Sequence, residues 1–251
     1  MSNIHKAFEN GKALAGFITG GDPSIEKSEE FILKIVEAGA DLIEIGVPFS
    51  DPIAEGPAIQ EANLRSLAAG TTTDRIFELV ANVRKKTRVP VVLFAYMNQV
   101  FKYGYDRFFR QCRQVGVDGV VIPDLPYEEK GDVACAAETY QVDVLSLIAP
   151  AKEERIRKIS EHAKGFLFTV TAKETGVTGQ DFASVLQVAR RHANVPVAVG
   201  GINDPALAAR LSGLFDGIIV GSAIVKLCGQ YGKEAGEPIF QYVQEMKAAI
   251  K

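Results

Sequence analysis

The sequence predicts an α/β fold, a single (β/α)8 barrel of the TIM-barrel class that spans residues 1–251. Short apolar runs rich in Val and Ile alternate with longer amphipathic stretches, and this alternation occurs eight times. The runs are mostly continuous, as expected for parallel strands that are covered on both faces. The length of 251 residues suits one such barrel, and no low-complexity linker divides the chain.

Each predicted strand is followed by a predicted helix. This order favours a parallel sheet with right-handed crossovers, and eight repeats favour closure into a barrel over an open sheet. The strands are expected at residues 14–19, 42–47, 89–96, 119–122, 142–148, 165–170, 195–199 and 217–220. The helices are expected at residues 25–38, 74–86, 105–115, 128–140, 153–162, 182–192, 204–212 and 239–249. Gly39 is expected to end the first helix, and Thr73 to cap the second.

Three connections after strands are long, and they cover residues 48–58, 97–104 and 171–181. Because they follow strands, they are expected at the face of the barrel where such proteins keep their chemistry. In the third connection, Gly176 and Gly179 surround the hydroxyl of Thr178. We expect this segment to close over a substrate as a lid.

The composition indicates a soluble globular protein, with 47% hydrophobic and 24% charged residues. The net charge of −3 gives no reason to expect nucleic acid or an anionic membrane as a partner. No apolar run is long enough to span a bilayer, and the first residues lack a signal-peptide core, so a cytoplasmic location is expected. Cys112, Cys135 and Cys228 are widely spaced, which favours reduced thiols over a disulfide framework or a zinc site.

Glu44 lies in the middle of the second predicted strand. Side chains alternate along a strand, so Leu42, Glu44 and Gly46 are expected to point into the barrel. A buried carboxyl without a partner tends to keep its proton, and a raised pKa suits a general acid or base at neutral pH. An interior salt bridge, or a register that exposes Glu44, is the alternative.

The loop after this strand contains two acids, Asp51 and Glu55, in a backbone that three prolines and a glycine restrict. Asp51 precedes a proline and is better interpreted as a turn residue.

Glycine turns end the seventh and eighth strands, at Gly200-Gly201 and at Gly221. Glycines allow backbone N–H groups to approach an anion closely, and a helix that starts at Ser222 would add its positive dipole end. Barrels often bind phosphate at these two loops, so a phosphate site is predicted here. Two tight turns without a ligand are the alternative.

The sequence resembles the tryptophan synthase α subunit family. The most specific likeness is LIEIGVPFSDP at 42–52, which is continued by Gly56-Pro57 and Ile59-Gln60. Four further segments resemble the family in the same order, namely GFITGGDP at 16–23, PDLP at 123–126, GVTG at 176–179 and GSAIV at 221–225. The likeness extends from Ala15 to Leu227.

The resemblance implies a lyase of L-tryptophan biosynthesis that cleaves indole-3-glycerol phosphate to indole and glyceraldehyde 3-phosphate by a retro-aldol reaction, with no metal and no cofactor in this subunit. Glu44 would act as acid toward the indole C3 and as base toward the glycerol hydroxyl. Glu55 would steady the positive charge on the indole N–H. The implied substrate-binding residues are Phe17, Ile59, Tyr96, Asp124, Phe168 and Thr178, and the implied phosphate-binding residues are Gly179, Gly201, Gly221 and Ser222.

The resemblance also implies a partner, the tryptophan synthase β subunit, in an α2β2 tetramer whose pyridoxal phosphate belongs to the β subunit. Residues 48–58 and 97–104 are the expected contact loops, with Asn98, Gln99 and Phe101 as candidates. A plain solvent-facing loop is an equally good interpretation of these three residues.

Three positions depart from the family pattern. Glu55 replaces the family's aspartate, and the extra methylene moves the carboxylate by up to ~1.5 Å. Gly200-Gly201-Ile202 stands where the family has Gly-Phe-Gly-Ile, and Phe168 replaces a tyrosine. Three alternatives stay open: another enzyme on the same barrel, against which the specific Glu44 loop argues, a weakly active regulatory subunit, which the change to Glu55 favours, and a free-standing lyase that needs no partner.

Overall fold

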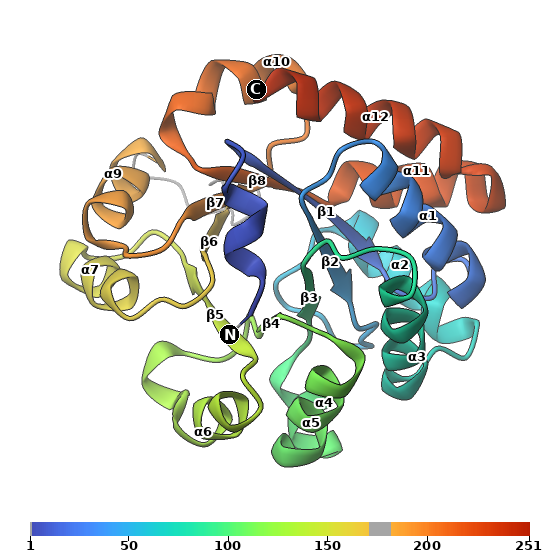
Figure 1. Ribbon diagram of the computed structural model, residues 1–251, viewed down its shortest axis with the longest axis horizontal. Coiled ribbons are helices and arrows are strands. Elements are labelled where there is room, and N and C mark those ends of the chain that lie inside the picture. Colours follow the sequence, from blue (N-terminus) through green and yellow to red (C-terminus); the bar gives the residue numbers. More distant parts are fainter. Residues whose placement is uncertain (1, 171–181) are drawn as a thin grey trace.

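Eight parallel strands form a closed barrel in the order β1 to β8, as the sequence predicts. The computed structural model describes residues 2–170 and 182–251, and helices surround the ring of strands within that part of the chain (Figure 1). The strands are β1 (Ala13–Thr19), β2 (Leu42–Gly46), β3 (Val91–Phe94), β4 (Gly119–Val121), β5 (Asp143–Ile148), β6 (Leu167–Val170), β7 (Val197–Gly200) and β8 (Gly217–Val220). The ring closes where β1 pairs with β8, with Leu14 opposite Ile218.

Alternation along the strands separates two apolar layers. Ile43 and Ile45 pack against the helices, whereas Leu42 belongs to the cluster inside the barrel. Glu44 lies between Phe17 of β1 and Val92 of β3 in the strand register, and its exposed fraction is 0%. The predicted register of the second strand is therefore confirmed, and the alternative that exposes Glu44 is wrong.

The predicted helices are present with small changes at their ends. Gly39 follows the first helix with a φ of 102°, the left-handed conformation expected there. Thr72, rather than the expected Thr73, caps the next predicted helix, because its side chain accepts a hydrogen bond from the Arg75 N–H. The helices that correspond to these predictions are α1 (Ile25–Glu37), α3 (Thr73–Arg84), α5 (Tyr105–Val115), α6 (Gly131–Thr139), α7 (Glu153–Glu161), α9 (Phe182–His192), α10 (Pro205–Leu211) and α12 (Gly236–Ala249).

Two further helices lie partly in segments predicted as loops. Helix α2 (Pro57–Ala68) starts inside the expected loop 48–58, and α4 (Met97–Tyr103) occupies almost all of the expected loop 97–104. In α2 the buried residues include Asn63 and Ser66, whereas Leu64 is 62% exposed, so the apolar pattern is weak. Helix α11 (Ser222–Tyr231) begins at Ser222, as the phosphate prediction requires.

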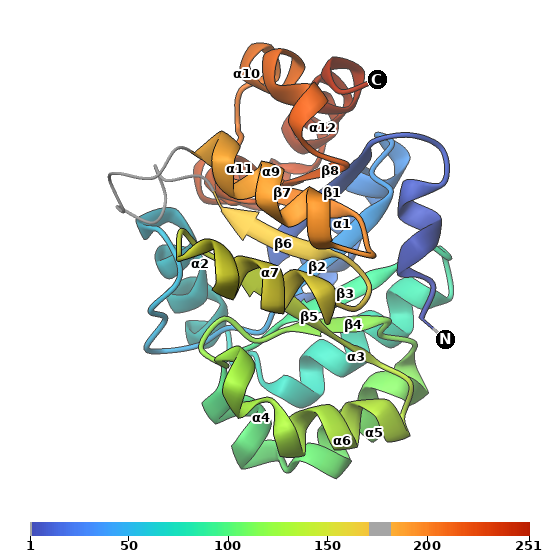
Figure 2. The same cartoon turned by 90° about the vertical axis from the view of Figure 1, so that its left-hand side faces the viewer.

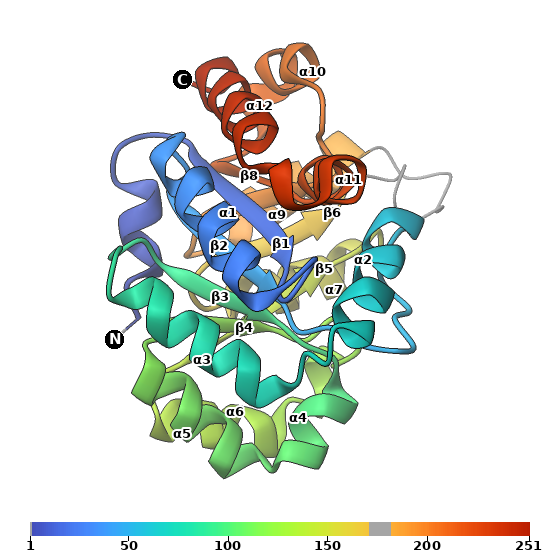
Figure 3. The same cartoon turned by 90° about the vertical axis from the view of Figure 1, so that its right-hand side faces the viewer.

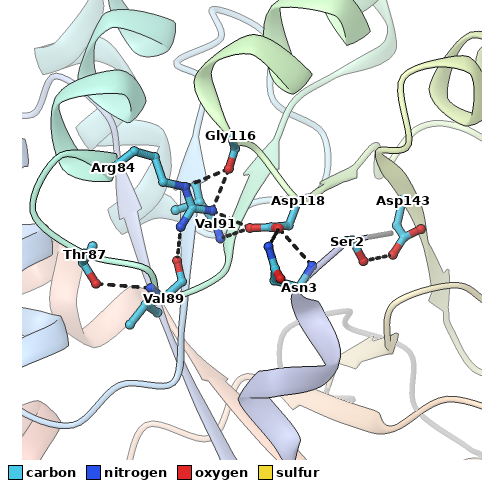
Figure 4. A network of polar contacts seen from close by, with 9 residues as sticks. All are labelled: Ser2, Asn3, Arg84, Thr87, Val89, Val91, Gly116, Asp118 and Asp143. Atoms are coloured by element: carbon cyan, nitrogen blue, oxygen red, sulfur yellow. Dashed lines mark hydrogen bonds and ion pairs between the residues drawn. The ribbon is translucent and has the colours of Figure 1, made fainter.

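The end of the barrel opposite α2 carries a short 3-10 helix, η1 (Ile4–Phe8) (Figures 2 and 3). Its preceding residue Asn3 donates from its backbone N–H and from its side chain to the Asp118 carboxylate, at 3.0 and 3.2 Å. Arg84 pairs with the same carboxylate and donates to the Gly116 carbonyl at 2.8 Å (Figure 4). These polar contacts tie the chain's first turn to α3 and to the starts of β3 and β4.

The thiols match the sequence-based expectation. Cys112, Cys135 and Cys228 are free, with Cys112 and Cys228 buried and Cys135 exposed. Burial raises the pKa of the Cys228 thiol to about 12, so this group stays neutral at physiological pH. In the described part of the chain, no helix has the length and apolarity needed to cross a membrane.

Candidate active site

A cavity of about 340 Å³ opens at the carboxyl ends of the strands, within the range of small-molecule sites. It combines residues from β1, β2, β3, β5, β6, β7 and β8 with residues of the loops that follow several of these strands. Eight of the predicted site residues line it, namely Phe17, Glu44, Glu55, Ile59, Phe168, Gly201, Gly221 and Ser222. The barrel therefore brings the predicted carboxylates, the apolar residues and the glycine turns to one place.

Glu44 is the most deeply buried acid of this cavity. Its exposed fraction is 0%, and neither carboxyl oxygen has a hydrogen-bond partner among the residues that the structure describes. Burial raises its pKa from 4.5 to about 8, and the negative charge of Glu55 adds to the shift. At neutral pH the carboxyl therefore holds its proton, and no described residue forms the interior salt bridge considered from the sequence. Glu44 can act as a general acid.

Glu55 reaches the same cavity from the loop between β2 and α2. Its Oε2 atom accepts a hydrogen bond of 2.5 Å from the Asn63 side-chain amide, and Gln60 donates to its backbone carbonyl at 2.8 Å. Burial raises its pKa from 4.5 to about 7, while the Asn63 hydrogen bond acts in the opposite direction. Near neutral pH a large share of Glu55 is therefore ionised while Glu44 stays protonated. Two carboxyls in different charge states can divide the roles of acid and electrostatic stabiliser.

The walls between the two acids are apolar and aromatic. Phe17 packs edge-to-face on Phe94, with ring centroids 6.0 Å apart, and Phe168 and Ile219 complete the surface. Such a slot suits a planar aromatic ring. Phe94 and Ile219 did not appear among the sequence candidates. Their inward positions on β3 and β8 follow from the same alternation that located Glu44, which is the signal that could have found them.

The glycine turns after β7 and β8 also line the cavity. Gly200, Gly201, Gly221 and Ser222 all line it, and Ser222 is the first residue of α11. A Cβ atom at Gly200 would lie 2.9 Å from the Phe168 ring, and one at Gly221 would lie 3.1 Å from Phe17. Side chains larger than hydrogen would therefore push the aromatic walls inward. Backbone N–H groups and a helix N-terminus at these turns can attract an anion.

Two predicted substrate residues do not line the cavity. The Tyr96 hydroxyl accepts a hydrogen bond of 3.0 Å from the Ala54 N–H, and its ring stacks on Phe49. Asp124 accepts a hydrogen bond of 2.8 Å from the Met97 N–H at the start of α4. In this structure both side chains support the loops around the cavity. Thr178 and Gly179, the other two predicted residues, lie outside the described residues.

A buried protonated acid, a second acid with a raised pKa and an aromatic slot at the carboxyl ends of the strands define a (β/α)8-barrel enzyme with acid–base chemistry. The chain belongs to the tryptophan synthase alpha chain family, whose sequence model matches residues 4–251. It has the α-subunit role in tryptophan biosynthesis and is a lyase.

Curated relatives and solved structures agree with this assignment. The tryptophan synthase alpha chain of Lacticaseibacillus casei is 40% identical and is aligned over 100% of this chain and 96% of its own length. That of Geotalea uraniireducens is 44% identical over 100% and 98% of the two chains. The crystal structure of the subunit α from Legionella pneumophila has a TM-score of 0.91 at 32% identity, covering 100% of this chain and 98% of its own. A chain of the tryptophan synthase α2β2 complex from Pyrococcus furiosus has a TM-score of 0.87 at 32% identity, covering 95% and 99%.

Proposed function

We propose that the cavity binds indole-3-glycerol phosphate and that Glu44 and Glu55 carry its retro-aldol cleavage to indole and glyceraldehyde 3-phosphate. One observation carries the proposal: two carboxyls with raised pKa values, one of them fully buried, face the same aromatic-walled cavity. The anion-attracting glycine turns line the same cavity.

The residue roles follow from the charge states. The Glu44 carboxyl gives its proton to the indole C3, which turns the ring into a cation and an electron sink. The Glu55 carboxylate stabilises the positive charge on the ring N–H in this proposal. Glu44, now a carboxylate, takes the proton of the glycerol hydroxyl next to the ring. The C–C bond then breaks, its electron pair returns to the ring, and indole, the aldehyde and protonated Glu44 remain.

The phosphate of the substrate is assigned to Gly201, Gly221 and Ser222. Their backbone and the first turn of α11 offer the N–H donors and the dipole that an anion needs. The roles expected of Thr178 and Gly179 toward the substrate and its phosphate stay predictions.

The partner that we propose is a tryptophan synthase β subunit in an α2β2 tetramer, with pyridoxal phosphate in the β subunit. The Pyrococcus furiosus relative is described as part of an α2β2 complex. On this chain, Ile53 after β2 and Phe101 in α4 are 79% and 66% exposed, on the two segments predicted to contact a partner. A cytoplasmic location remains our prediction.

Steady-state cleavage of indole-3-glycerol phosphate, measured with and without a β subunit, tests the proposal. Weak activity that the β subunit raises supports the α-subunit role with catalytic acids in this chain. Strong activity alone would favour a free-standing lyase, and no cleavage with a stimulated β subunit would favour a regulatory subunit. Glu44→Gln and Glu55→Gln are each expected to reduce kcat by at least 10²-fold. Glu61→Gln, an exposed acid of α2, is the matched control and should keep full activity.

A further inference from the structure

We propose that Asn63 is a positioning residue for this reaction, which holds the Glu55 carboxylate in place and keeps it ionised while the substrate ring is protonated. The inference rests on the proposed role of Glu55. Asn63 does not line the cavity, and it acts through the acid that does.

Helix α2 holds Glu55 at two points. The Asn63 Nδ2 atom donates to the Glu55 carboxylate over 2.5 Å, and the Gln60 Nε2 atom donates to the Glu55 backbone carbonyl over 2.8 Å. Asn63 is 2% exposed, whereas Gln60 is exposed, so the two contacts differ in character. Gln60 fixes the backbone from the solvent side, and Asn63 fixes the charged group from the protein interior.

The helix that carries Asn63 is itself anchored. Arg65 donates two hydrogen bonds, of 2.8 and 2.7 Å, to the carboxylate of Asp22, which is 1% exposed. Ser66 donates to the Gly20 carbonyl over 2.6 Å. Both anchors join α2 to the segment after β1, the strand that contributes Phe17 to the cavity. These anchors fix the position of the Asn63 amide relative to Phe17. The hydrogen bond from this amide in turn fixes the position of the Glu55 carboxylate.

The amide also suits the electrostatics of the site. Within residues 2–170 and 182–251, the titratable groups that interact with Glu55 are Glu44 from β2 and Tyr96 just after β3, and neither brings a positive charge. A neutral donor stabilises the anion without neutralising it, so the charge of Glu55 stays available for a cationic ring. An arginine or lysine in place of Asn63 would hold the carboxylate equally well but would cancel that charge.

The test compares pH profiles of kcat/KM for Asn63→Leu and Gln60→Ala in the full chain, assayed with a β subunit. Leucine keeps the approximate size of asparagine but removes the donor. We expect the acid limb of the Asn63→Leu profile to move up by about one pH unit. At pH values below this limb, kcat/KM should then be about tenfold lower than in the parent. Gln60→Ala removes only the contact to the backbone, and its limb should stay where it is.

A uniform loss of rate in Asn63→Leu, with an unmoved acid limb, would show a merely structural role and overturn the inference. If leucine disturbs folding, Asn63→Asp carries the same test at equal size, and its limb must move up at least as far because a second carboxyl then faces Glu55. Glu55→Gln separates the two proposals. Full turnover of Glu55→Gln would refute the role of Glu55 itself. Slow turnover of Glu55→Gln together with an unshifted pH profile of Asn63→Leu would refute only the role of Asn63.

Discussion

Replacing Glu44 by glutamine tests the buried proton directly, through stability instead of activity. The folded-state pKa of about 8 exceeds the ordinary value of 4.5, so the folded chain retains a proton that the unfolded chain loses in this range. Folded-state stability must then fall as the pH rises from 4.5 to about 8. Glutamine is neutral at every pH and removes this loss. Below pH 4.5 both forms of the protein carry a neutral side chain, and the advantage of glutamine disappears.

The magnitude follows from the two pKa values. Between pH 5 and pH 7, the stability of Glu44→Gln relative to the parent should increase by about 2.5 kcal/mol. For a chain of this size that is roughly 5–10 °C in Tm. Equilibrium urea unfolding at pH 5 and pH 7 measures the free energy of unfolding of each variant relative to the parent. For the control Glu61→Gln, this relative value should be the same at both pH values. An equal gap at both pH values would mean that residue 44 ionises normally, and the acid role of Glu44 would lose its basis.

Further predictions concern the pH profile, the glycine turns and the anchors. The rate of cleavage should peak between about pH 7 and pH 8, because Glu55 must be ionised and Glu44 protonated; a flat profile from pH 6 to 9 would contradict this assignment. Gly221→Val should raise KM roughly tenfold or more in steady-state assays, because the new side chain displaces the aromatic wall. Arg65→Met should lower the free energy of unfolding in urea by about 3 kcal/mol, because it leaves the buried Asp22 carboxylate without its ion-pair partner. Arg84→Lys keeps the positive charge but cannot donate to the Gly116 and Val89 carbonyls at the same time. It should lower the free energy of unfolding by about 1–2 kcal/mol.

The parts of the fold that follow local rules could be predicted from the sequence. Strand alternation placed Glu44 inside the barrel, and the glycine turns at 201 and 221 fell at the cavity because parallel strands end on one face. Helix α2 escaped prediction because its buried face is partly polar, with Asn63 and Ser66. These two buried side chains form hydrogen bonds with Glu55 and with the Gly20 carbonyl. A periodic pattern of apolar residues does not reveal such partners.

The orientation of Tyr96 shows the same limit. The sequence suggests contact of this aromatic residue with the substrate ring, whereas in the structure its hydroxyl oxygen accepts a hydrogen bond from the Ala54 N–H. That partner lies 42 residues away, so only the folded barrel brings the two together. The contact of Asn63 with Glu55 is close in sequence, yet it depends on where α2 begins, and the sequence pattern indicates no helix over residues 59–68.

The pairing of β1 with β8 has a consequence for the chain while it is being made. One edge of β1 can find its neighbour β2 early, but the other waits for a strand about 200 residues further along. At about 5–20 residues per second, translation takes roughly 10–40 s to supply it. Throughout that interval the nascent half-ring exposes unsatisfied amides and carbonyls along Ala13–Gly16, a segment to which chaperones, or a neighbouring nascent chain, could add a strand of their own.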